Sequence, residues 1–95
     1  MLTGKQKRFL RAIGSTIDPI VQVGKGGVGP NLIQQLDEAL EAREVVKVRV
    51  LRNCLEEREE VAETLAQATK AEVAQQIGSN ILFYRKSKKP QIELP

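Results

Sequence analysis

The most distinctive feature of the chain is a short glycine-rich segment, residues 24–29, with the sequence Gly-Lys-Gly-Gly-Val-Gly. It holds four of the seven glycines and one lysine, and it lies between an apolar, β-branched run and a helix-forming pattern that opens at Pro30. Glycine permits positive φ and close approach of the backbone to a ligand, and a helix start offers unpaired N–H groups and partial positive charge. This segment, the glycine loop, therefore predicts a phosphate site, with a plain tight turn as the alternative.

The glycine loop does not match the motifs of nucleotide-binding proteins. Its residues 25–29 resemble the beginning of the variant Walker A loop of the MinD and ParA type, which continues with a lysine for phosphate and a serine or threonine for magnesium. Pro30 and Asn31 stand at those two positions here. The G-x-G-x-x-G spacing of dinucleotide-binding folds is missing as well. We expect no nucleotide cofactor, and a GxxG loop between two elements is closer to the backbone clamp of KH-type RNA binders.

Few side chains of this sequence could carry catalysis or hold a metal ion. Histidine is absent, which removes the commonest metal ligand and proton shuttle, and Cys54 is the single cysteine. One cysteine cannot form an internal disulfide, and with no histidine to activate it we interpret it as a small packed hydrophobe. The sequence thus indicates a protein that is not an enzyme, with no catalytic residue, no metal site and no cofactor.

The charges are distributed unevenly along the chain. Residues 1–29 carry five basic and one acidic side chain and residues 64–95 carry five basic and two acidic, whereas residues 37–63 hold nine acidic and five basic. If both ends fold to one side, that side attracts polyanions. No apolar run approaches the roughly 20 residues that span a bilayer, and the first residues lack a secretory signal pattern. We therefore expect a cytoplasmic protein without a membrane partner.

The first half of the chain is expected to form two helices and two strands. Residues 3–6 have the spacing of a capping box, which predicts a helix that packs through Phe9 and ends at a left-handed Gly14. A strand over residues 20–23 leads into the glycine loop, and an amphipathic helix follows the loop. Alternating valines and basic residues predict a second strand over 45–52 with a basic outer face.

The second half is expected to form a long helical connection and one or two strands. The pattern over residues 56–68 is helical, and a second capping-box spacing at residues 69–72 predicts that the helix restarts at a bend and runs almost to Gly78. A strand over 81–85 and an optional edge strand over 91–94 complete the order αβαβααβ(β). This order predicts an α/β fold with helices packed on a sheet. We expect one compact domain that covers residues 1–95.

Three stretches of the sequence resemble the CRM domain, the chloroplast RNA splicing and ribosome maturation module, in its stand-alone bacterial YhbY form. They are residues 2–8, residues 20–28, and residues 77–78 leading into residues 82–85, and with the pattern between them they cover nearly the whole chain. The resemblance implies a mixed sheet of three or four strands, as in the C-terminal domain of translation initiation factor three. It also implies an RNA-binding protein that associates with precursors of the large ribosomal subunit in ribosome assembly.

The RNA contacts are expected on the glycine loop and on nearby basic surfaces. The resemblance assigns them to the GxxG loop and the basic first helix, and we add two residues from the basic group beside Tyr84, although such charges also protect a sheet edge. With only three aromatic side chains, base stacking should be weak and phosphates should dominate binding by a monomer. The expected contact residues are Gly24, Lys25, Gly26, Gly27, Lys5, Lys7, Arg8, Arg11, Arg85 and Lys86.

Two further functions fit parts of the sequence. A protein-interaction adaptor could use the acidic surface between Glu56 and Glu63 and merely contain a glycine turn. An enzyme could hold a small phosphorylated ligand in the loop, but the sequence offers no nucleophile paired with a base. Insensitivity of a pull-down to ribonuclease would favour the adaptor, and stabilisation by nucleotides but not by RNA would favour the enzyme.

Overall fold

The computed structural model of the protein describes all 95 residues. Three helices and four strands follow one another in the order αβαβαββ. Their bounds are α1 Gly4–Gly14, β1 Val21–Val23, α2 Pro30–Arg43, β2 Val45–Val50, α3 Arg58–Thr69, β3 Glu72–Ile77 and β4 Asn80–Tyr84. The chain is folded into one unit, with a radius of gyration of 12.4 Å.

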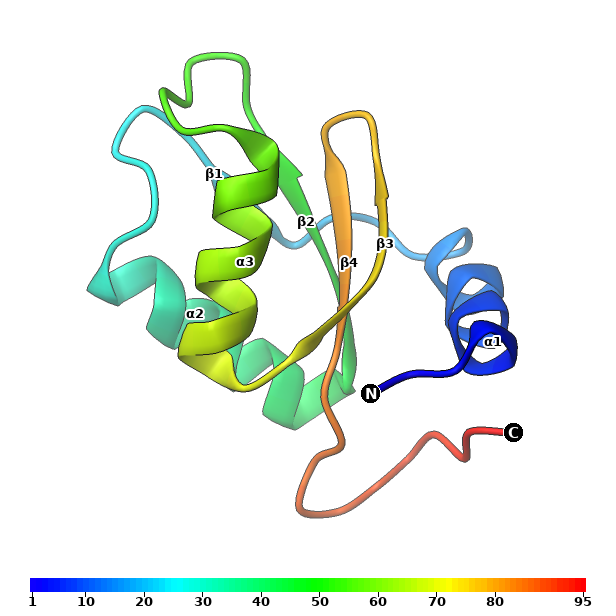
Figure 1. The fold of residues 1–95 in the computed structure, drawn as a ribbon. Coiled ribbons are helices and arrows are strands. Elements are labelled where there is room, and N and C mark those ends of the chain that lie inside the picture. Colours follow the sequence, from blue (N-terminus) through cyan, green and yellow to red (C-terminus); the bar gives the residue numbers. More distant parts are fainter.

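The four strands form one mixed sheet in the order β1-β2-β4-β3. β1 pairs parallel with β2, as expected for two strands joined through a crossover helix, whereas β4 runs antiparallel to both β2 and β3. Figure 1 shows α2 and α3 on one side of the sheet and α1 on the other. The predicted fold class, an α/β domain with a mixed sheet of three or four strands, is confirmed.

Both faces of the sheet carry a hydrophobic core. The larger core lies under α2 and α3 and includes Val46, Leu65 and Phe83. The smaller core lies under α1 and includes Leu10 and Tyr84. Because successive residues of a strand point to opposite faces, the adjacent Phe83 and Tyr84 of β4 are buried in different cores. Both aromatic side chains of this strand therefore hold the fold together.

Helix α1 begins as the sequence predicts but ends differently. The Thr3 hydroxyl accepts from the Gln6 N–H at 3.1 Å and the Gln6 side chain accepts from the Thr3 N–H at 3.0 Å, so the capping box is present. The prediction of a left-handed Gly14 is wrong, since this residue lies inside the helix and the cap, Ser15, has φ −68°. A Cβ on Gly14 would come within 2.6 Å of a Leu82 methyl group, so glycine lets α1 approach β4 closely. Phe9, predicted to pack, is 39% exposed.

The largest correction concerns residues 72–77, which form strand β3 and not a second piece of helix. Helix α3 is capped by Lys70, which adopts the left-handed conformation with φ 59°, and this reverses the chain direction. The following segment then pairs antiparallel with β4, with an irregularity between Val73 and Gln75. Residues with good helix propensity form a strand here because pairing with β4 supplies the backbone hydrogen bonds and buries Ala74.

The other boundaries shift by a few residues. β2 stops at Val50, two residues before its predicted end, and α3 starts at Arg58, two residues after its predicted start. A connecting loop therefore occupies residues 51–57 and holds Cys54 and Glu56. The optional edge strand over residues 91–94 does not form, and this C-terminal segment instead crosses the protein as irregular chain.

Candidate functional site

The glycine loop is an ordered turn between β1 and α2. The Gly24 carbonyl accepts from the Gly27 N–H at 3.0 Å, which closes a turn of four residues around Lys25 and Gly26. Gly27 has φ +65°, a conformation that side chains other than glycine rarely adopt. Of the glycines in this loop, Gly27 is the one with positive φ, so the turn depends on this position most directly.

A carboxylate stabilises the far side of this turn. Glu56, from the loop before α3, accepts a hydrogen bond from the Val28 N–H with its Oε1 atom at 2.8 Å. The same oxygen lies 2.1 Å from the position that a Cβ on Gly27 would occupy. Glu56 thus occupies one backbone donor that the sequence pattern leaves free for an anion, and its carboxylate lies where a Cβ of residue 27 would be. The sequence places Glu56 on an acidic helix surface and offers no sign of this contact.

The other N–H groups of the loop donate no hydrogen bond within the protein. Lys25 and Gly26 are exposed, and a Cβ added to Gly26 or Gly29 would meet no atom within 4 Å. Gly29 is the N-cap of α2 and provides no side-chain cap, while Pro30 occupies the first helical position. The first-turn N–H groups of α2 consequently have no side-chain acceptor and can receive an anion at the positive end of the helix dipole. The loop, the lysine and the helix start form one open, positively polarised surface.

The basic residues of α1 do not lie beside this surface. Lys5, Arg8 and Arg11 are exposed and Lys7 is half-buried, and no acidic side chain forms an ion pair with them. Figure 1 shows α1 and the glycine loop on opposite sides of the sheet. These expected contact residues therefore form two separate groups in the structure, one on the glycine loop and one on α1.

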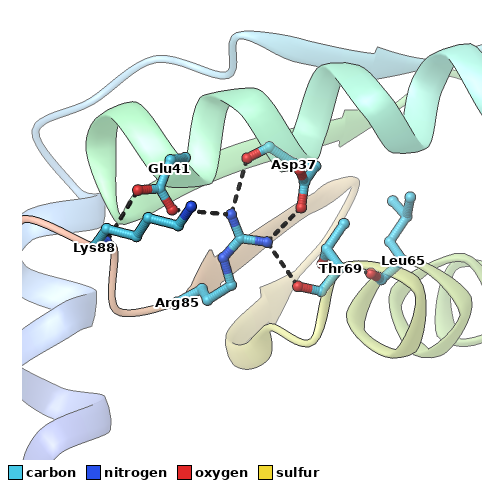
Figure 2. Close-up of polar contacts among 6 residues, drawn as sticks. All are labelled: Asp37, Glu41, Leu65, Thr69, Arg85 and Lys88. Atoms are coloured by element: carbon cyan, nitrogen blue, oxygen red, sulfur yellow. Dashed lines mark hydrogen bonds and ion pairs between the residues drawn. The ribbon is translucent and has the colours of Figure 1, made fainter.

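Arg85 is held by side-chain and backbone groups of two helices. Its guanidinium pairs with Asp37 and lies 3.7 Å from a Glu41 oxygen, both on α2, and it donates to the Thr69 carbonyl at the end of α3 at 2.8 Å (Figure 2). The side chain is only 19% exposed. Arg85 therefore fastens the end of β4 to both helices with its guanidinium already engaged, and the expected RNA contact at this residue stays a prediction. Lys86, its neighbour, is exposed.

A buried carboxylate that no sequence pattern indicates organises the C-terminal segment. Glu44 has 0% exposure and accepts backbone N–H groups from Ser87, Gln91 and Ile92 at 2.9, 2.6 and 2.8 Å. Burial opposes ionisation of this carboxyl, but the three donors outweigh it and lower the pKa of Glu44 below its ordinary value. Burial, with the nearby charges of Glu44 and Glu72, raises the pKa of Tyr84. Glu44 thus replaces the predicted edge strand as the anchor of this segment.

Metal-ligating side chains do not gather in this fold. Cys54 is half-buried against the larger core, and its thiol donates to the Glu56 carbonyl at 3.7 Å. No three metal-ligating side chains converge on a common point. None of the three helices combines the length and the apolar character needed to cross a bilayer.

Comparison with known proteins links this arrangement to a family. The family model of the CRS1 / YhbY (CRM) domain matches residues 2–85. The chain is 55% identical to Probable RNA-binding protein YqeI of Bacillus subtilis, over 96 aligned residues that cover 100% of both chains. It is 31% identical to a Haemophilus influenzae protein named RNA-binding protein, with 99% of this chain and 95% of that protein covered. A Staphylococcus aureus protein solved in solution, also 55% identical over both full lengths, has a TM-score of 0.84.

Proposed function

The chain belongs to the CRS1 / YhbY (CRM) domain family, and from this membership we propose that it binds structured RNA through its glycine loop. The names of its relatives in Bacillus subtilis and Haemophilus influenzae describe RNA binding, which supports RNA as the partner. In this proposal residues 1–95 act as a single RNA-binding unit without a nucleotide cofactor or a catalytic step.

One observation carries the proposal, namely the open surface formed by the glycine loop and the start of α2. The turn around Gly26 is already closed by the hydrogen bond between Gly24 and Gly27, and the next residue, Val28, is bonded to the Glu56 carboxylate. Little conformational entropy is therefore lost when a phosphate docks, and preorganised donors bind more tightly for this reason. The Gly26 backbone allows a phosphate to approach closely, and the exposed Lys25 adds a positive charge beside it.

The finer parts of the proposal concern the RNA and the cellular setting. From the family resemblance we propose that the RNA is that of the large ribosomal subunit or its precursor particle, and that the protein acts there in ribosome assembly. Such a partner is consistent with a cytoplasmic monomer. Lys5, Lys7, Arg8 and Arg11 would then contact a second region of the same RNA, because α1 lies on the other side of the sheet.

The test measures binding to large-subunit precursor RNA over a salt series for variants of the loop. Gly26→Asp is the informative variant, because this position is open and needs no positive φ, so the folded loop accepts the side chain. We expect the new carboxylate to repel phosphate and weaken binding at least tenfold. Lys25→Ala should have a smaller effect and should lower the slope of log affinity against log salt by the amount expected for about one phosphate contact. Unchanged affinity of Gly26→Asp would exclude the glycine loop from the interface.

A matched control distinguishes a local effect at the glycine loop from a general effect of net charge on affinity. Gln67→Glu adds the same single negative charge on the exposed surface of α3, close to the helix end that is remote from residues 51–57. Its affinity should stay within about twofold of the wild type, since one surface charge beyond a Debye length is largely screened. Equal decreases in affinity for Gln67→Glu and Gly26→Asp would indicate a non-specific effect of net charge.

A protein-interaction adaptor remains the second candidate, on the observation that α3 exposes acidic side chains with no basic partner. These residues are Glu59, Glu60 and Glu63. Glu56 no longer belongs to this surface, because its carboxylate is bonded to the glycine loop. A pull-down whose partners survive ribonuclease treatment and disappear when these three residues are changed to glutamine would favour the adaptor.

A further inference from the structure

A cluster of three arginines surrounds a hollow next to the glycine loop. Arg49 comes from β2, Arg52 from the loop after it, and Arg58 from the first residue of α3. The hollow, called the arginine hollow, has a volume of about 480 Å³ and is also lined by Glu56 and by the turn between β3 and β4. None of these arginines was among the contact residues expected from the sequence, where two glutamates directly precede Arg58.

The folded chain brings the three arginines together through backbone contacts between neighbouring turns. The Val50 N–H donates to the Ser79 carbonyl at 2.7 Å, and the Leu51 N–H donates to the Val23 carbonyl at 2.8 Å. These bonds align the end of β2 with the β3–β4 turn on one side and with the end of β1 on the other. Arg58 donates to the Gly78 carbonyl at 2.7 Å, so its guanidinium is already held at the rim of the hollow.

The hollow has an excess of positive charge. The ion pairs of the protein involve Met1, Arg85 and their acidic partners, and none includes an arginine of the hollow. The one carboxylate on its wall, Glu56, already accepts the Val28 N–H. Three guanidinium groups therefore face solvent around a concave surface with one engaged anion, which favours a polyanion as the ligand.

Glu56 also shows that the hollow and the glycine loop adjoin each other. Its carboxylate lines the hollow and, at the same time, bonds to the loop at Val28. Asn53, in the segment that borders the hollow, lies 3.6 Å from the Cβ position of Gly24. A phosphodiester strand that leaves the loop in this direction passes directly over the arginines.

We propose that the arginine hollow is a second phosphate subsite, which binds the phosphates next to those held by the glycine loop on the same RNA strand. The proposal rests on the proposed function, because it uses the same RNA. Guanidinium groups bind phosphate oxygens through paired N–H donors, and three of them on separate elements fix the direction of the strand. No aromatic side chain lines the hollow, so it contributes affinity and orientation but no base recognition.

The first experiment measures binding of a short single-stranded RNA over a salt series by fluorescence anisotropy. The test variant carries Arg49→Gln and Arg52→Gln together, because neither side chain donates a hydrogen bond within the protein, unlike Arg58. The control is the single change Arg43→Gln, at the far end of α2, a helix of 14 residues and hence about 20 Å long. We expect the slope of log affinity against log salt to fall by about 0.7 for each phosphate that the double variant no longer neutralises, and to stay unchanged in the control.

The second experiment follows the side-chain Nε–H signals of the arginines by NMR while tripolyphosphate is added to the wild-type protein. We expect the signals of Arg49, Arg52 and Arg58 to shift at lower concentration than that of Arg43. Thermal unfolding of the double variant should match the wild type, which shows that any decrease in RNA affinity is not caused by unfolding.

The outcomes distinguish this inference from the proposed function. If Gly26→Asp abolishes RNA binding while the double variant behaves like Arg43→Gln, the glycine loop stands and the second subsite is wrong. If both the double variant and Gly26→Asp weaken binding, both proposals are supported. If tripolyphosphate shifts the arginine signals but the wild type binds neither the short RNA nor the large-subunit precursor RNA, RNA is overturned as the ligand of both sites.

Discussion

The Glu56 carboxylate accepts the Val28 N–H at 2.8 Å, and this single hydrogen bond joins an acidic side chain to the glycine loop. The contact spans 28 residues of sequence and connects the segment before α3 to the glycine loop before α2. It orders the loop, but it also places a negative charge where phosphate is proposed to bind. Glu56 is therefore expected to stabilise the loop and, at the same time, to weaken the proposed binding of phosphate there.

These two effects are separable by substitution. Glu56→Gln keeps an amide oxygen that can accept from Val28 and removes the charge, so RNA should bind roughly threefold to tenfold more tightly at low salt, as expected for one nearby charge. Glu56→Ala removes the bond as well and should lower the free energy of unfolding by about 1 to 2 kcal/mol. Anisotropy titrations and urea unfolding measure the two quantities. Weaker RNA binding by a fully folded Glu56→Gln variant would contradict this account.

The two central glycines of the loop should respond differently to alanine. At Gly27 a Cβ would collide with Glu56 Oε1 and the residue must keep φ +65°, so Gly27→Ala should destabilise the protein by roughly 1 to 2 kcal/mol or more. Gly26→Ala meets no atom within 4 Å and should unfold like the wild type. Denaturant unfolding of the two variants decides the matter. Equal stability of both would mean that the loop rearranges at no cost.

The buried Glu44 should make the C-terminal segment sensitive to acid. The pKa of this carboxyl is lowered in the folded protein, so its contribution to stability is complete above the ordinary value of 4.5 and is lost as the pH falls through the folded pKa. The Gln91 and Ile92 amide signals should therefore report release of the segment in this acid range. Glu44→Gln serves as the control, because its amide cannot titrate. The amide NH2 group also donates at the position where a carboxylate oxygen of Glu44 accepts from the Ser87 N–H. Acid release that persists unchanged in this variant would assign the transition to another group.

Arg85 should matter for stability and not for RNA. Arg85→Gln breaks its contacts with Asp37, Glu41 and the Thr69 carbonyl, and removing charge-assisted hydrogen bonds from a side chain that is 19% exposed should cost about 2 kcal/mol. The salt dependence of RNA binding, measured under folded conditions, should stay as in the wild type. Lys86→Gln is the neighbouring control and should unfold normally, since Lys86 is exposed. A reduced salt slope in Arg85→Gln would return this residue to the interface.

Local sequence patterns predicted the parts of the structure that depend on local interactions. The capping box of α1 joins Thr3 and Gln6, three residues apart, and Pro30 starts α2 at the first helical position. The alternation of β2 places Val46 and Val48 in the larger core and leaves Arg49 exposed on the other face. Each of these features is readable because all of its determinants lie within a few residues.

The errors and omissions come from contacts between distant residues. β3 has helix-forming residues and becomes a strand because β4 is available beside it. Glu44 and Glu56 look like surface acids, and each is instead bonded to backbone amides, 28 residues away for Glu56 and 43 to 48 residues away for Glu44. The arginines of the hollow converge through turns whose relative positions are set by the sheet. Charge and propensity alone do not encode these distances.

The position of the two chain ends has a practical consequence. The Gln6 side chain donates to the Pro95 carbonyl at 3.2 Å, so the last residue lies against the first turn of α1, and Figure 1 shows both ends on the side of the molecule away from the glycine loop. Ends on the same side of a protein allow a circular permutation, in which a linker joins residue 95 to residue 1 and the chain is opened elsewhere. Opening the chain within the turn at Gly78 would also cut the rim of the arginine hollow. The permuted protein would keep the glycine loop on a continuous backbone, whereas the arginine hollow beside it would lose part of its support.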